Sequence, residues 1–192
     1  MSDRLTLVCH APTAATARAA FPADEPLDER GRGWADEVGG DRFSRASLAL
    51  HAPAPACRET ATALGLSARP EPALRDWDLG RWRGRTLDEV GVDEPDAVGA
   101  WLSEPGAVPH GGEPLTGLLA RVADWLTEVA VEGHTVVVTH PAVVRAAVVG
   151  ALGAPATGFW RIDPPPLTAT ELRGRAGHWT LRSTGRPLRT PT

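Results

Sequence analysis

Apolar positions recur along this chain with two different periods, one typical of strands and one typical of helices. Short apolar runs rich in β-branched residues, such as Leu5–Cys9 and Thr135–Thr139, are typical of buried strands. In Glu113–Val129, apolar residues recur every three or four positions and so share one face of a helix. The whole pattern predicts strands at Leu5–Cys9, Arg45–Leu50, Thr135–Thr139, Thr168–Arg173 and Trp179–Ser183, and helices at Leu27–Val38, Pro55–Leu64, Glu113–Val129 and Pro141–Gly153.

The order of these elements predicts the fold class. Strands and helices alternate, which favours an α/β fold with a mainly parallel sheet between two layers of helices, a three-layer α/β/α arrangement. A chain of 192 residues without repeats suits a single domain, so we assign residues 1–192 to one unit. Residues 71–112 are rich in proline, glycine and tryptophan and are long for a loop, which predicts a cap or an active-site insertion.

Charge and composition exclude several classes of function. The formal net charge of −4 at pH 7 argues against non-specific binding of nucleic acid or of an anionic membrane. The absence of lysine excludes Schiff-base chemistry and a P-loop lysine. Two cysteines without metal-ligand spacing argue against a disulfide framework and a metal site. The chain opens without a signal peptide and has no apolar run long enough for a bilayer, so we expect a cytoplasmic protein.

Two histidines lie where ligands bind in α/β sheets. His10 follows the strand Leu5–Cys9, and His140 follows the strand Thr135–Thr139. Ligands in such folds bind outside the carboxyl ends of the strands. An imidazole at that place can attack phosphorus as a nucleophile or carry a proton near neutral pH. We therefore expect the two side chains to share one site.

Several short motifs surround these histidines. Residues 7–11 read Leu-Val-Cys-His-Ala, and residues 26–31 read Pro-Leu-Asp-Glu-Arg-Gly. Residues 74–84 read Leu-Arg-Asp-Trp-Asp-Leu-Gly-Arg-Trp-Arg-Gly, and residues 111–114 read Gly-Gly-Glu-Pro. Residues 137–145 read Val-Val-Thr-His-Pro-Ala-Val-Val-Arg. In type and in order, these motifs resemble those of the histidine phosphatases, a family with a phosphoglycerate mutase-like fold.

The resemblance implies a reaction and the residues that carry it. It implies a phosphomonoester hydrolase that acts on a small phosphorylated metabolite through a phosphohistidine intermediate, without cofactor or metal. His10 would be the nucleophile, and His140 would be the second histidine, which polarises the phosphoryl group. Asp76 stands at the position of the proton donor, where the family has the longer glutamate, and Glu113 would line the substrate pocket. We expect a monomer or a homodimer.

The chain departs from the family at both arginines that hold the phosphate. The first of them directly precedes the nucleophilic histidine, where this chain has Cys9, and the second falls on Ala56. An arginine fork binds phosphate bidentately, and the loss of one such donor costs about 10²–10³ in rate. Arg58 and Arg145 are candidates for replacing this charge, while Cys9 and Ala11 would border the bound group.

Two other functions stay open at this point. The loss of both arginines also fits a catalytically impaired protein that keeps the fold for binding or regulation. The pair of His10 and His140 with one carboxylate also fits acid–base chemistry on a less charged substrate, which would need no arginine. Phosphate release from phosphomonoesters, and its loss in His10→Ala, distinguishes the phosphatase from both alternatives.

Overall fold

The computed structural model describes residues 3–129, 131, 133–175 and 177–189, which form strands, α-helices and short 3-10 helices. The strands are β1 (Asp3–Cys9), β2 (Leu48–His51), β3 (Arg69–Pro70), β4 (His134–Thr139), β5 (Thr168–Arg175) and β6 (His178–Pro187). The α-helices are α1 (Ala14–Arg18), α2 (Glu29–Val38), α3 (Pro55–Ala63), α4 (Leu87–Asp93), α5 (Pro95–Ser103), α6 (Leu115–Glu128) and α7 (Pro141–Leu152). The 3-10 helices are η1 (Gly40–Phe43), η2 (Pro72–Leu74), η3 (Gly80–Trp82) and η4 (Ala156–Arg161).

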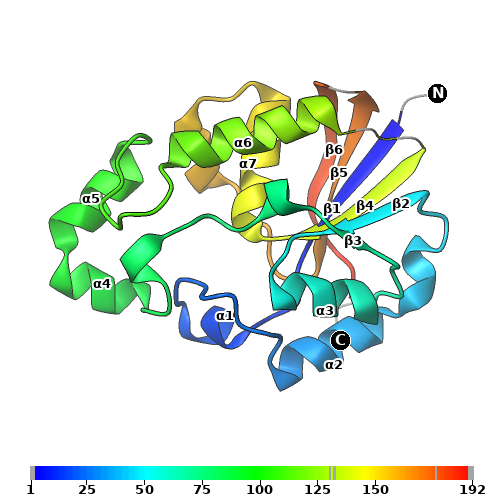
Figure 1. Cartoon of the computed structure of the whole chain (residues 1–192), viewed down its shortest axis with the longest axis horizontal. Helices are drawn as coiled ribbons and strands as arrows, with labels where there is room; N and C mark the ends of the chain where they lie inside the picture. Colours follow the sequence, from blue (N-terminus) through cyan, green and yellow to red (C-terminus); the bar gives the residue numbers. More distant parts are fainter. Residues whose placement is uncertain (1–2, 130, 132, 176, 190–192) are drawn as a thin grey trace.

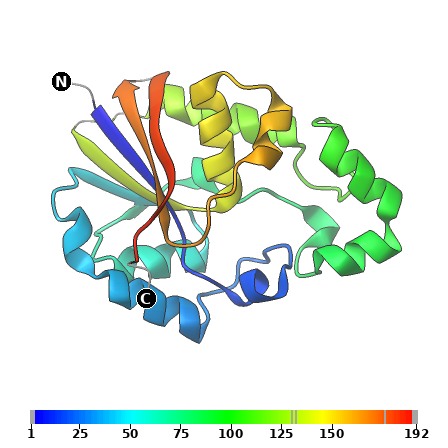
Figure 2. The same cartoon turned by 180° about the vertical axis from the view of Figure 1, so that it is seen from behind.

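A six-stranded sheet forms the middle layer of the molecule. Helices α2 and α3 cover one face of this sheet, and α6 and α7 cover the other (Figures 1 and 2). Helices α4 and α5 extend beyond the sheet to one side (Figure 1). The predicted α/β fold with helices on both faces of a central sheet is therefore confirmed.

The sheet brings two strand ends together. Its strand order is β3-β2-β4-β1-β5-β6, with the first four strands parallel and with β5 and β6 antiparallel to their neighbours. In the register of β1 and β4, Cys9 lies opposite Thr139. The next residues, His10 and His140, therefore leave the sheet at the same edge. The backbone N–H of His10 donates to the carbonyl of Thr139 at 3.0 Å, which extends this pairing by one residue.

Burial explains why β1 and β4 have continuous apolar sequences. Every residue of β4 after His134 is buried, and so is every residue of β1 from Leu5 onward. Strands that are covered on both faces by helices need apolar side chains on both faces. Helix α7 then starts at Pro141, because proline suits the first helical position, and it ends before Gly153, whose φ is 58°.

Some element boundaries differ from the sequence prediction. The second strand begins at Leu48 rather than Arg45, because η1 and a turn occupy the preceding residues. The helix predicted from Glu113 begins at Leu115, because Pro114 has an extended backbone, with φ −67° and ψ 155°, and is the N-cap residue. The pattern did not predict α1, whose five residues depend on a side-chain capping box rather than on apolar periodicity.

Residues 71–112 contain η2, η3, α4 and α5 and contact the rest of the molecule through aromatic rings. The ring centroids of Trp101 and Trp160 are 4.6 Å apart, and those of Trp77 and Phe159 are 5.5 Å apart. Phe159 and Trp160 belong to η4, which follows α7 in the chain, so these contacts hold residues 71–112 against η4. Aromatic pairs at such distances stabilise beyond the area that they bury.

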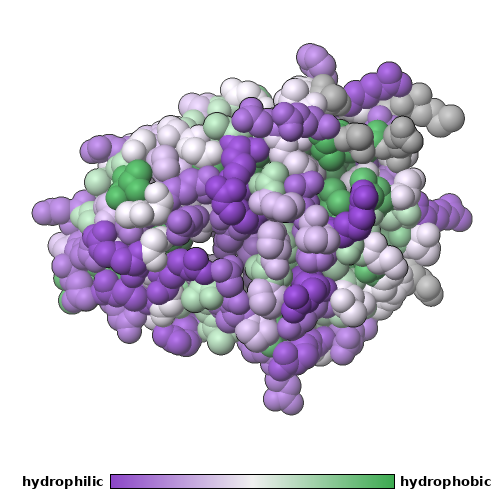
Figure 3. Space-filling model, in the orientation of Figure 1, coloured by the Kyte–Doolittle hydropathy of each residue, from purple (hydrophilic) through white to green (hydrophobic). Residues whose placement is uncertain are grey.

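The surface is largely polar. The face shown in Figure 3 is mainly hydrophilic, with hydrophobic residues in small separate patches. Exposed large hydrophobic side chains include Val92 in α4 and Leu152 in α7, which lie on different elements. Among the residues that the structure describes, no helix is both long and apolar enough to cross a bilayer.

Candidate active site

His10 and His140 lie side by side at the carboxyl edge of β1 and β4. Their ring centroids are 5.2 Å apart, and the rings meet edge to face at an interplanar angle of 73°. Both side chains are nearly buried, with 7% of His10 and 3% of His140 exposed. The parallel register of the two strands produces this contact, because each histidine is the first residue after its strand.

The hydrogen bond of His10 determines which ring nitrogen is free. Nδ1 lies 2.7 Å from the carbonyl oxygen of Ala11, which can only accept, so Nδ1 carries the proton and donates it. Nε2 keeps its lone pair, and no described residue forms a hydrogen bond with it. Burial, and then the charge of His140, lowers the pKa of His10 to about 4. The ring is therefore neutral and nucleophilic at neutral pH.

His140 lies between a carboxylate and a thiol. Its Nδ1 is 3.3 Å from Oδ2 of Asp76, within ion-pair distance but without a hydrogen bond, and its Nε2 is 3.5 Å from Sγ of Cys57. Burial raises the pKa of Cys57 well above its usual value, so the thiol stays protonated and donates to Nε2. Burial also lowers the pKa of His140 to about 4, which leaves a neutral ring with its proton on Nδ1, facing Asp76.

The pKa of Asp76 is raised. Burial raises this pKa to about 6, although the backbone N–H of Trp77 and the charges of His10 and Arg121 oppose the shift. One carboxylate oxygen accepts the N–H of Trp77 at 2.8 Å, and the other faces His140. A carboxyl group with this pKa exchanges its proton close to neutral pH, as general acid catalysis requires.

The cleft above the two histidines is small and acidic. Its volume is about 10 Å³, close to the space that one water molecule needs. Its lining residues are His10, Thr13, Pro22, Asp24, Glu25, Ala54, Ala56 and His140. These described lining residues include two carboxylates and no arginine. In the described part of the chain, no group of three or more histidine, cysteine or acidic side chains could hold a metal ion.

The loop 20–27 supplies one wall of the cleft and is tied to residues 71–112. The backbone of Phe21 exchanges hydrogen bonds with Arg85 and Gly84, both at 2.8 Å. Asp24, which has a positive φ of 60°, forms an ion pair with Arg83. These contacts hold the loop over the histidine pair.

Glu25 fastens the same loop to the start of α1. Its carboxylate accepts the hydroxyl of Thr13 and the N–H of Ala23, both at 2.8 Å. Partial burial raises the pKa of this carboxyl, but these hydrogen bonds outweigh burial and lower it. Glu25 is therefore ionised at neutral pH, so the cleft carries negative charge.

Cys9, Ala11 and Arg58 are not among the residues that line the cleft. Cys9 is buried at the end of β1, and burial raises the pKa of its thiol to about 12. The N–H of Ala11 donates to the hydroxyl of Thr60 at 3.0 Å. Arg58 is exposed on α3, while Ala56 lines the cleft, because two helical residues are separated by about 200°.

Arg145 and Glu113 have partners of their own. Arg145 lies 3.5 Å from Asp163, and its guanidinium is 5.6 Å from the ring centroid of Phe159. Glu113 accepts a bidentate pair of hydrogen bonds from Arg121, at 3.0 Å from Nε and 2.7 Å from Nη2. The structure thus places neither of the two predicted residues in the lining of the histidine cleft.

Arg121 is a residue of this region that the motifs did not indicate. Its Nη1 donates to the carbonyls of Ala73 and Arg75, at 2.6 and 3.1 Å, directly before Asp76. Only 13% of its side chain is exposed, because it lies on α6 one turn after the buried Leu118. A charged residue on an apolar helix face implies a buried partner, and this signal was present in the sequence.

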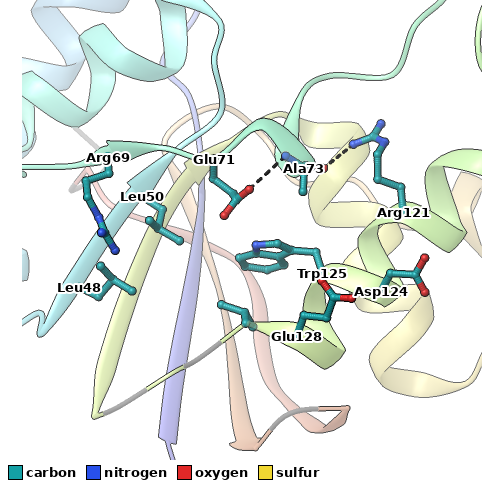
Figure 4. A pocket seen from close by; sticks show the side chains of 10 residues that line it. Leu48, Leu50, Arg69, Glu71, Ala73, Arg121, Asp124, Trp125 and Glu128 are labelled. Carbon is teal, nitrogen blue, oxygen red and sulfur yellow. Dashed lines mark hydrogen bonds between the residues drawn. The ribbon is translucent and has the colours of Figure 1, made fainter.

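A larger cavity lies away from the histidines, between α6, the edge strand β3 and its neighbour β2. Its volume is about 650 Å³, and its lining residues are Leu48, Leu50, Arg69, Glu71, Ala73, Arg121, Asp124, Trp125, Glu128 and Val129. In Figure 4, Arg121 reaches from α6 to the carbonyl of Ala73 at the edge of this cavity. The cavity contains neither histidine nor Asp76 in its lining, but it shares Arg121 with the segment that carries Asp76.

Comparison with known families covers almost the whole chain. Residues 5–186 match the histidine phosphatase superfamily, branch 1. The chain belongs to this superfamily. Phosphoserine phosphatase 1 of Hydrogenobacter thermophilus is 32% identical over 148 residues, which are 71% of this chain and 69% of that protein. Glucosyl-3-phosphoglycerate phosphatase of Mycolicibacterium vanbaalenii is 29% identical over 153 residues, with 63% and 68% covered.

Solved structures share the fold of this histidine phosphatase. The mycobacterial glucosyl-3-phosphoglycerate phosphatase in complex with VO3 has a TM-score of 0.82 at 25% identity, over 96% of this chain and 99% of that one. A putative α-ribazole-5′-P phosphatase from Escherichia coli has a TM-score of 0.83 at 21% identity, with both chains fully covered. The family resemblance of the sequence motifs is therefore confirmed.

Proposed function

We propose that this histidine phosphatase hydrolyses a phosphomonoester of a small metabolite through a phosphohistidine on His10. The family and two relatives that are named as phosphatases support phosphomonoester hydrolysis. The observation that carries the proposal is the arrangement of His10, His140 and Asp76. The two ring centroids are 5.2 Å apart, and Asp76 lies 3.3 Å from His140.

The reaction needs two steps, and the three residues have a part in each. In the first, the lone pair on Nε2 of His10 attacks phosphorus, and a P–N bond forms as the P–O bond to the leaving group breaks. Protonated Asp76 gives its proton to the leaving oxygen, while His140 borders the phosphoryl group. In the second, the carboxylate of Asp76 takes a proton from water as the water oxygen attacks phosphorus. The P–N bond then breaks, which restores His10 and releases phosphate.

The replacement of both phosphate arginines, by Cys9 and Ala56, is part of this proposal. Three observations support it. The described lining of the cleft includes Ala56 and no arginine, Arg58 is exposed on the far side of α3, and Arg145 lies beside Asp163. We expect turnover to be slow compared with family members that have both arginines, because each lost donor costs about 10²–10³ in rate.

The remaining parts of the proposal concern the whole protein. We propose a single domain, residues 1–192, in which residues 71–112 act as a cap, and a cytoplasmic monomer or homodimer. The cleft has room for about one water molecule, whereas a phosphoryl group is larger. We therefore propose that the loop 20–27 moves away from the histidines when substrate binds, as loops do in many enzymes.

The test measures phosphate release by the wild-type protein and by His10→Ala. The substrates are p-nitrophenyl phosphate, phosphoserine, glucosyl-3-phosphoglycerate and a panel of other phosphorylated metabolites. Alkaline quenching during turnover should retain a phosphohistidine in the wild-type protein and none in His10→Ala. The control is Arg189→Gln, which changes an arginine that pairs with Glu37 outside the cleft. A folded wild-type protein without His10-dependent phosphate release on any substrate would refute the phosphatase reaction and favour the binding or regulatory alternative.

A further inference from the structure

Two helices begin at the histidine cleft without a side-chain cap. The N-cap residue of α3 is Ala54, and the N-cap residue of α7 is His140; both residues line the cleft. Neither residue forms a side-chain hydrogen bond with its own helix. The first N–H groups of a helix have no partner inside that helix, and they point toward its N-terminus. Here they point toward the cleft.

The unpaired donors can be identified from the backbone hydrogen bonds. Pro55 and Pro141 occupy the first positions of α3 and α7 and have no N–H. The N–H groups of Ala56, Ala142 and Val143 follow, and no described residue accepts a hydrogen bond from any of the three. Two helix starts thus supply three free donors beside the same cleft.

A second observation at the same place points to a ligand. His10 is only 7% exposed and lines the cleft, and its Nε2 has no partner among the described residues. Buried polar atoms in proteins are normally paired, so this unpaired ring nitrogen beside unpaired N–H groups indicates a site for a group that is bound during turnover.

We propose that the N-termini of α3 and α7 replace the two missing arginines as the groups that bind the phosphate. This inference rests on the proposed function, because it concerns the phosphoryl group of that same site. A helix N-terminus carries about half a positive elementary charge and binds phosphate through its N–H groups. Two helices thus supply about one positive charge where the family has two arginines. Phosphate binding should be weaker than in the family but should persist.

The two carboxylates of the cleft, Asp24 and Glu25, weaken the binding of an anion only in part. Asp24 is paired with Arg83. Glu25 has both oxygens occupied, one by the hydroxyl of Thr13 and the other by a backbone N–H. Neither carboxylate has a described contact with the N–H groups at the two helix starts, so these donors are available to phosphate.

Substitution of Ala54 tests the proposal, because a cap at this position would take the N–H groups of α3 that phosphate needs. Ala54→Asp and Ala54→Asn both place good N-cap residues there, whereas Ala54→Leu adds similar bulk without a cap. Ala54→Ser adds a single oxygen and serves if the larger variants fail to fold. The readouts are the inhibition constant of inorganic phosphate against p-nitrophenyl phosphate, phosphate binding followed by ³¹P NMR, and the Tm.

We expect Ala54→Asp and Ala54→Asn to raise the Tm by about 2–4 °C, because they cap α3. The same variants should weaken phosphate binding about tenfold to a hundredfold, and aspartate more than asparagine because it adds a negative charge. Ala54→Ser should change both quantities in the same directions but less. Ala54→Leu should weaken binding less than Ala54→Asn and should not raise the Tm.

Three results would overturn the inference. One is unchanged phosphate binding in a capped variant whose Tm has risen. The second is an equal loss of binding in Ala54→Asp, Ala54→Asn and Ala54→Leu, because bulk alone would then explain it. Either result, found together with His10-dependent hydrolysis by the wild-type protein, leaves the proposed function standing. The third is a wild-type protein that neither binds phosphate nor hydrolyses a phosphomonoester, which overturns the inference and the function together.

Discussion

Replacing Arg121 with glutamine should strongly destabilise the protein. Arg121 donates from Nε and Nη2 to both carboxylate oxygens of Glu113, at 3.0 and 2.7 Å. Its Nη1 donates to the carbonyls of Ala73 and Arg75. On the other side of Asp76, the backbone carbonyl of Glu113 accepts the indole N–H of Trp77 at 2.7 Å. Arg121 and Glu113 thus hold the acid-bearing segment at both ends.

The size of the expected loss of stability follows from the burial of the Arg121–Glu113 pair. Arg121 and Glu113 are each only 13% exposed, so the loss of one partner leaves the other charge poorly solvated. Breaking such a buried pair costs about 3–5 kcal/mol. Arg75 stays 3.5 Å from Glu113 and compensates in part, so we expect the lower value, about 3 kcal/mol. In a chain of this length that loss lowers the Tm by about 6–12 °C.

Urea unfolding followed by tryptophan fluorescence measures this loss. A double-mutant cycle of Arg121→Gln and Glu113→Gln isolates the pair, and its coupling energy should reach about 1.5–3 kcal/mol. The control is Arg189→Gln, which removes the pair with Glu37, whose carboxylate is 58% exposed. Exposed pairs contribute about 0–1 kcal/mol. A loss in Arg121→Gln no larger than in Arg189→Gln would refute the reasoning.

Three further predictions concern pH and packing. Hydrolysis should need protonated Asp76, so kcat/KM should fall about tenfold per pH unit above the pKa of this residue, about 6. In Arg121→Gln this decrease should move to higher pH, because the charge of Arg121 lowers the pKa of Asp76. A flat profile from about pH 5 to 9 would contradict the acid role. Folding lowers the pKa of His10 and His140 from 6.5 to about 4, so the unfolded chain binds more protons between these values, and the free energy of unfolding should decrease as the pH falls through that range. Asp76, whose pKa is raised, acts in the opposite direction, but it is one group against two. Equal urea midpoints at about pH 4.5 and 7 would contradict this prediction. Trp101→Ala should lower the free energy of unfolding by about 3–5 kcal/mol, because it removes the buried ring through which residues 71–112 contact Trp160 of η4. An unchanged Tm would show that this aromatic contact contributes little.

The parts of the site that follow from local pattern could be predicted from the sequence. The strand ends at Cys9 and Thr139 are visible as the limits of apolar runs, and the parallel topology then places His10 and His140 together. Helical periodicity likewise separates Ala56 in the cleft from an exposed arginine two residues later. Each of these inferences needs only the period of one element and a general rule of α/β folds.

The parts that depend on contacts between distant segments could not be predicted. Cys57 and His140 are separated by 82 intervening residues, and nothing in either local pattern indicates their 3.5 Å contact. Arg121 reaches the carbonyl of Ala73 because α6 packs beside η2, which no periodicity encodes. The acidic residues of the cleft, such as Glu25, belong to an irregular loop, whose sequence has no helical or strand periodicity from which their positions could be predicted.

The distance between the imidazoles of His10 and His140 depends on main-chain pairing. Cys9 and Thr139 form the last pair of the β1–β4 ladder, so we expect substitutions of side chains within these strands to shift His10 and His140 only slightly. Deleting one residue from β4 would instead draw His140 into the ladder and turn its side chain toward the opposite face. Along these strands, insertions and deletions should therefore abolish activity far more often than amino-acid replacements. A scan of single-codon deletions would map the boundaries of the site while leaving the side chains of the site itself unchanged.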